Sequence, residues 1–149
     1  MKLVYLALLT VIGCGTTRLN HPTPKGFVEL DARRPYHYRA VTADGLVIAA
    51  RVIDHKPKGE VSFWTTAIAN QLRQAGYALL EEREVQTESG LAGKQLRFGH
   101  DEGQRPHLYY VTLFVTASSI YVLEAGGTRQ QVEASADQIA WAIKNFRAE

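Results

Sequence analysis

The sequence predicts an α+β domain over residues 27–149, in which an antiparallel sheet is flanked by helices as an α-β-α sandwich. Two observations carry this prediction. Segments rich in β-branched and aromatic residues follow one another with short turns between them, which is typical of antiparallel strands. Two other segments repeat their apolar residues at three and four positions, which is typical of helices that pack one face on a sheet. Such a length fits a single domain with its own core.

The first half of the domain is expected to be antiparallel β. Strands are predicted over residues 27–30, 36–41 and 46–53. The last of these, LVIAARVI, is largely apolar on both faces and β-branched, which favours a strand in the middle of the sheet. Asp44-Gly45 directly before it is a hairpin signal.

The segment that begins at Val61 changes to a helical period. Its apolar residues are spaced three and four apart and line one face: Val61, Trp64, Ile68, Leu72 and Ala75. Gly76 follows at once, and glycine can take the left-handed conformation that ends a helix. We expect this helix to pack its apolar stripe on the sheet.

A meander of strands follows the helix. The strands are predicted over residues 77–87, 89–98, 107–116 and 120–125, with GHDEGQRP, residues 99–106, as a turn or loop. Within the first of these strands Glu82 and Glu84 are expected to share one face while Glu81 points to the other, because side chains alternate along a strand.

A closing helix is predicted after Gly126-Gly127. Thr128 and Gln131 have the spacing of a reciprocal capping box at its start. Its apolar stripe runs to the terminus through Val132, Ala136, Ile139, Ile143 and Phe146. Trp141 falls off this stripe, so we interpret it either as a candidate partner-facing aromatic or as an ordinary exposed side chain.

The chain begins MKLVYLALLTVIGCGTT, with Lys2 before an apolar run and small residues behind it. A positive start, a short apolar core and a small-residue exit are typical of a secretory signal, here residues 1–13. The run is about half the roughly 20 apolar residues that a membrane-spanning helix needs. The polar segment over residues 14–26 carries two prolines and no apolar period, so it is expected to be a tether.

The only cysteine, Cys14, stands directly behind this apolar run. Val11-Ile12-Gly13-Cys14 resembles the bacterial lipobox. The resemblance implies cleavage before Cys14 and a diacylglycerol on its thiol, so that acyl chains such as palmitate hold the mature lipoprotein on a membrane. Gly15, where aspartate would retain such a protein at the inner membrane, implies the outer membrane facing the periplasm. A buried structural cysteine is the alternative.

The charge of the chain does not indicate a nucleic-acid partner. The formal net charge is +2 at pH 7 and falls to about +1 without Lys2. ARRPYHYR, residues 32–39, mixes cations with tyrosines, but we interpret it as a strand with the tyrosines on one face and solvated cations on the other. An acidic partner surface or lipid headgroups stay open as alternatives.

The order of elements resembles the PsbP-like fold family. The resemblance is carried by FWTTAIANQLRQAGYALLEE, GLAGKQLRF, LYYVTLFVTASSIYVLEAGG and IAWAIKNFRAE, and it covers about residues 27–147. Because these segments lie at core and turn positions, the resemblance implies a fold and carries no functional motif over to this chain. Members of that family are mostly binding or assembly proteins.

We find no catalytic or metal-binding constellation in the sequence and expect no cofactor. One dense polar cluster, His100, Asp101, Glu102 and His107, could hold a cation or poise a base; a solvated loop is the alternative. Gly126-Gly127 before a helix could receive an anion, although paired glycines are commonly just a turn.

Three functions remain open from the sequence alone. The first is a non-enzymatic binding or assembly module of the bacterial cell envelope, with an envelope protein as its partner. The second is an envelope hydrolase or metal-dependent enzyme that uses the hairpin from His100 to His107. The third is a carrier that holds a small ligand in a cleft between helix and sheet.

Overall fold

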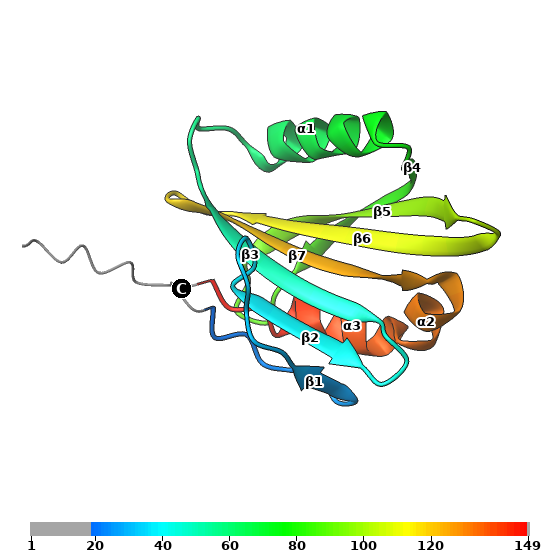
Figure 1. Cartoon of the computed structure of the whole chain (residues 1–149). Coiled ribbons are helices and arrows are strands. Elements are labelled where there is room, and N and C mark those ends of the chain that lie inside the picture. Colours follow the sequence, from blue (N-terminus) through cyan, green and yellow to red (C-terminus); the bar gives the residue numbers. More distant parts are fainter. Residues whose placement is uncertain (1–18, 149) are drawn as a thin grey trace, which may run out of the picture.

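A computed structural model describes residues 19–148 as one antiparallel sheet with helices on both faces (Figure 1). The strands stand in the order β1-β2-β3-β7-β6-β5-β4. Their bounds are Phe27–Glu29 (β1), Tyr38–Thr42 (β2), Val47–Asp54 (β3), Ala78–Gln86 (β4), Ala92–Glu102 (β5), Arg105–Val115 (β6) and Ser119–Thr128 (β7). The helices are Val61–Gln74 (α1), Arg129–Ala134 (α2) and Ala136–Lys144 (α3). This arrangement confirms the predicted fold class.

The helices cover opposite faces of the sheet, as Figure 1 shows for α1 on one side and α2 and α3 on the other. Alternation along the strands builds a core on each face. Leu96, Phe98 and Val111 belong to the core beneath α1, whereas Phe114 and Leu123 belong to the core beneath α3. None of the described helices is both long and apolar enough to cross a membrane.

The strand β3 lies between β2 and β7, which confirms the expected central position of this apolar run. Its eight residues pair with β7 from Val47 opposite Gly126 to Asp54 opposite Ser119. The strand β7 therefore lies between β3 and β6, and it joins the strands β1, β2 and β3 to the meander of β4, β5 and β6. Gly76, at φ 93°, follows α1 in the left-handed conformation expected of it.

The segment expected as a loop between β5 and β6 is largely strand. Pairing continues to Glu102 opposite Arg105, so only Gly103 and Gln104 form the turn. Gly103, at φ 65°, supplies the positive φ that so tight a turn needs.

The end of the chain also differs from the prediction of one long helix opened by paired glycines. Gly126 and Gly127 belong to β7 and pair with β6, so they do not present a helix N-terminus. The capping box of Thr128 and Gln131 is confirmed and starts α2. The helix then breaks at Ser135, at φ −107° and ψ 19°, and continues as α3.

The described part of the expected tether, residues 19–26, packs on the domain. Leu19 and His21 are 5% and 4% exposed and join the side of the core that α3 covers. The ring of His21 lies 5.3 Å from the ring of Phe146, so the two ends of the described chain meet (Figure 1). Composition gave no sign of this, because the burial depends on a partner 125 positions away. Cys14 and the predicted signal lie outside the described residues.

The tyrosines of residues 32–39 do not share a face. The strand begins only at Tyr38, which is 1% exposed in the core beneath α3. Tyr36 precedes the strand and lies toward the carboxylate of Glu124 on the opposite face of the sheet, where burial and that carboxylate raise its pKa. The predicted one-sided pattern fails because alternation starts only where the strand does.

Candidate functional site

The polar cluster predicted at residues 100–107 lies on the hairpin of β5 and β6. His100 and His107 stand directly opposite each other. The ring of His100 stacks on Tyr77 at 4.7 Å, while Nδ1 of His107 lies 3.0 Å from the carbonyl oxygen of Arg105. Nε2 of His107 lies 3.4 Å from an exposed carboxylate oxygen of Glu102. These side chains make contacts within the hairpin and with Tyr77, which lies between α1 and β4.

Asp101 is not part of that group. It stands opposite Pro106, is exposed, and points to the other face of the sheet because it alternates with His100. Within residues 19–148 no three His, Cys, Asp or Glu side chains are placed to hold a metal ion. The expected cluster is thus divided between two faces.

A groove of about 720 Å³ lies between α3 and the strands β4, β5 and β6, on the face that α1 does not cover. Its volume lies in the range of ligand pockets, roughly 300–1,000 Å³. One wall is largely apolar and comes from the helices and one strand residue, with Val85, Val132, Ile139 and Ile143. The charged Glu133 and Lys144 also line the helix side. The floor and the opposite wall are polar, with Gln95, Arg97, Tyr110 and Arg83.

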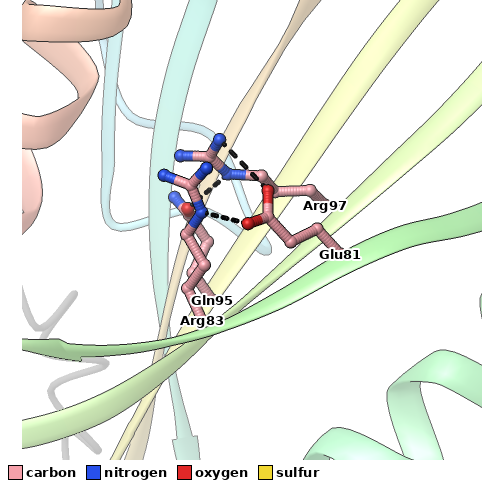
Figure 2. A network of polar contacts seen from close by, with 4 residues as sticks. All are labelled: Glu81, Arg83, Gln95 and Arg97. Atoms are coloured by element: carbon pink, nitrogen blue, oxygen red, sulfur yellow. Dashed lines mark hydrogen bonds and ion pairs between the residues drawn. The ribbon is translucent and has the colours of Figure 1, made fainter.

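Gln95 and Arg97 alternate with the buried Leu96 along β5 and therefore both face the groove. Gln95 is 2% exposed, and its Oε1 accepts a hydrogen bond of 2.8 Å from Nε of Arg97 (Figure 2). The Nε2 donor of Gln95 is buried and has no partner among the described residues. A buried donor without a partner costs roughly 1–3 kcal/mol, so this amide is an unusual group to find beside an apolar wall.

The guanidinium of Arg97 is held from several sides. Its Cζ lies 4.5 Å from the centroid of the Tyr110 ring, a cation-π contact. Oε2 of Glu81 lies 3.6 Å from Nη1 of Arg97, and Oε1 of Glu81 accepts a bond of 2.6 Å from Nε of Arg83 (Figure 2). The bond from Arg83 lowers the pKa of Glu81. Arg97 is therefore oriented before any ligand arrives.

A register shift in β4 places Glu81 beside these arginines. Leu79 pairs with Phe98 and Glu81 with Arg97, so Leu80 is left as an extra residue. Beyond the shift Glu82 and Glu84 point to the other face, where Nζ of Lys94 lies 3.1 and 3.7 Å from their carboxylates. The predicted division of the three glutamates is confirmed.

A second buried polar group lies on the face that α1 partly covers. Glu124 on β7 is 6% exposed and accepts a hydrogen bond from the hydroxyl of Tyr109. Nη2 of Arg51 lies 3.4 Å from the same Oε1. Burial, together with this carboxylate, raises the pKa of Tyr109. The contacts tie β3, β6 and β7 together, and we assign them a structural role.

Trp141 lies on α3 and is 42% exposed. It stands five residues before Phe146, against which His21 packs. The exposed indole is thus on the helix whose end meets the segment that leads back to Cys14. Its role toward a partner stays a prediction.

The sequence left open a ligand cleft between helix and sheet but indicated none of the residues that line this groove. The alternation in KQLRF is the signal that could have placed Gln95 and Arg97 on one face. Nothing in the sequence showed that a helix from the end of the chain would cover this face and bury the amide.

No family model and no curated protein matches the sequence.

Several solved structures match the fold. LpqN of Mycobacterium tuberculosis, described as involved in cell envelope biogenesis, matches with TM-score 0.68 and 15% identity over 85% of this chain and 79% of that chain. The cyanobacterial PsbP (CyanoP) of Synechocystis sp. PCC 6803 matches with TM-score 0.59 and 9% identity over 92% and 96%. PA94 of Pseudomonas aeruginosa, described as a protein of unknown function and putative regulator, matches with TM-score 0.52 and 13% identity over 83% of this chain and 81% of that chain. These likenesses confirm the PsbP-like fold.

Proposed function

We propose that this chain is a lipid-anchored, non-enzymatic binding module of the bacterial cell envelope that recruits or stabilises another envelope protein. The observation that carries the proposal is the junction at His21. Because His21 packs on Phe146, the described part of the tether, which begins at Leu19, lies against the chain just beyond the end of α3. A lipid on Cys14 would then hold the outer face of α3, with the exposed Trp141, close to the membrane.

Two further observations support this function. LpqN, which shares the fold, is described as involved in cell envelope biogenesis. The hairpin residues that an enzyme would use face in different directions, since Asp101 lies on the face opposite His100 and His107. A hydrolase or metal enzyme at this hairpin therefore has less geometric support than a binding module.

The partner is tested by photo-crosslinking in cells. A photoreactive amino acid replaces Trp141 in the full chain, and a matched chain carries it at Asn70, which is exposed on α1 on the opposite face. We expect a reproducible envelope protein to be captured from position 141 and not from position 70. Equal capture from both positions, or none from position 141, would contradict the partner role of α3.

The anchor is tested by fractionation of cells that express Cys14→Ser. We expect the serine variant to leave the membrane fraction or to keep its signal, because the thiol that carries the lipid is gone. If Cys14→Ser stays on the membrane at the mature size, the anchoring proposal is wrong. The crosslink at position 141 should also be lost in this variant.

A second candidate function is a carrier for a small ligand. The groove between α3 and the sheet favours it, because its volume and its mixed apolar and polar lining are those of a ligand pocket. This candidate does not exclude the first, since a carrier on a membrane also needs an acceptor.

A further inference from the structure

The groove combines an apolar wall with two oriented hydrogen-bond donors. Ile139 and Ile143 of α3 are 4% and 7% exposed and form part of the apolar side. Opposite them stand the Arg97 guanidinium and the Gln95 amide. Both groups donate hydrogen bonds, and guanidinium matches the geometry of carboxylate and phosphate oxygens. The apolar wall would bind a hydrocarbon part of a ligand, and the two donors would bind an oxyanion of the same molecule.

The buried amide is the strongest sign of a missing acceptor. Gln95 already uses Oε1 to hold Arg97, so its free donor Nε2 is the group that lacks a partner. Leucine at this place would fill similar volume without that cost. An oxygen placed between Nε2 of Gln95 and the guanidinium of Arg97 would satisfy the amide and add a charge-assisted bond.

Glu81 already contacts the Arg97 guanidinium in the structure. It is 43% exposed and lies 3.6 Å from Arg97, and ion pairs of such exposed groups contribute only about 0–1 kcal/mol. A ligand oxyanion would gain a hydrogen bond from the buried Gln95 amide as well as from the Arg97 guanidinium, so it can displace Glu81. The carboxylate would then keep its closer bond of 2.6 Å to Arg83.

We propose that this groove binds a small amphiphile with one oxyanion headgroup and an acyl or alkyl chain, its head on Arg97 and Gln95 and its chain along the apolar residues of α3. The proposal rests on the carrier function named above and is independent of the protein-partner function. Loss of the crosslink at position 141 would leave it intact.

Binding is measured by titration calorimetry on the full chain in phosphatidylcholine nanodiscs, with empty nanodiscs as the blank. Octanoate and octyl phosphate carry both parts of the proposed ligand, whereas octanol lacks the charge and inorganic phosphate lacks the chain. We expect saturable binding of the first two, at least about tenfold tighter than of the last two. No saturable binding above the blank overturns the proposal. Equal affinity for octanol overturns the role of the headgroup, and equal affinity for inorganic phosphate overturns the role of the chain.

Three variants locate the site, with Arg73→Gln on exposed α1 as the matched control. Gln95→Leu and Arg97→Gln are expected to weaken octanoate binding about tenfold, with thermal unfolding of each variant recorded to show that it folds. Glu81→Gln is expected to tighten binding roughly two- to fivefold, because it removes the competing carboxylate. A merely structural network predicts no such gain. Unchanged affinity in folded Gln95→Leu and Arg97→Gln, or weaker binding in Glu81→Gln, would overturn the assignment.

Discussion

The imidazole ring of His21 lies edge-on against the phenol ring of Tyr38, with the ring centroids 4.8 Å apart and the planes at 87°. Both nitrogens of His21 are buried and lack hydrogen-bond partners within the described chain. Burial lowers the pKa of His21 from 6.5 to about 4. The junction between tether and domain is therefore built on a histidine that is neutral when folded.

This histidine makes the stability of the domain depend on pH. Between pH 6.5 and about 4, His21 is protonated in the unfolded chain but stays neutral in the folded domain. The free energy of unfolding therefore falls as the pH drops through this range. The loss from this one group is at most about 3 kcal/mol. Urea unfolding at a series of pH values measures it.

Replacing His21 with phenylalanine tests whether the pH dependence of stability originates from this histidine. His21→Phe keeps an aromatic ring against Tyr38 and Phe146 and removes two unpartnered buried nitrogens, so its stability at pH 7 should equal or exceed that of the wild type. Its stability should change less between pH 6.5 and about 4. Tyr38→Phe, which loses only the bond to Thr23, should keep the wild-type pH slope. An unchanged slope in His21→Phe would contradict the assignment.

Tyr109 and Glu124 are expected to be energetically coupled. Glu124 is 6% exposed and has one oxygen, Oε2, without a partner in the described structure, so it depends on the donors at Oε1. Tyr109→Phe removes one of these donors and should lower the free energy of unfolding by roughly 1–3 kcal/mol. A double-mutant cycle with Glu124→Gln should give a coupling of at least about 0.5 kcal/mol. Strict additivity of the two variants would show that the hydrogen bond is of little consequence.

Gly93 and Gly99 form a matched pair on β5. A Cβ on Gly93 would lie 2.5 Å from the carbonyl oxygen of Leu113 and 2.5 Å from the ring of Phe114, both of which are fixed in the core. Gly93→Ala should therefore destabilise the domain by roughly 1–3 kcal/mol or more. Gly99→Ala meets only the flexible end of Leu80, at 3.2 Å, and should cost clearly less in chemical unfolding. The reverse order would contradict the packing described for this strand.

The two helix starts near the C-terminus should respond differently to loss of a hydroxyl. The side chain of Thr128 accepts the backbone N–H of Gln131, whereas Ser135 makes no such capping bond. Thr128→Ala should cost about 1 kcal/mol, while Ser135→Ala should change the stability little. Thermal unfolding of the two variants gives the comparison, and equal losses would argue against the capping box.

The elements of this fold were predictable because their patterns are local. The period of residues 61–75, the capping box at Thr128 and the apolar run of residues 46–53 each depend on neighbours in the chain. The extent of the β5–β6 hairpin was not predictable, because polar Asp101 and Glu102 pair through their backbone. Backbone pairing leaves no mark on the hydrophobic pattern.

The candidate site depended on contacts between distant segments and was only partly visible. Alternation could have placed Gln95 and Arg97 on one face, but the helix that covers this face begins more than thirty residues later. The register shift at Leu80, which places Glu81 beside Arg97, has no signature in the sequence. The burial of Leu19 and His21 likewise needs Phe146 from the other end of the chain.

The position of β4 at the edge of the sheet has a consequence for contacts between copies of the chain. An edge strand offers unpaired backbone groups to any other strand, and neighbouring copies could join their sheets through it. In β4 the run from Glu81 to Glu84 is entirely charged and exposed, and the bulge at Leu80 interrupts its flat backbone. At the other edge β1 is only three residues long. Both edge strands therefore disfavour the joining of sheets from neighbouring copies into one continuous sheet.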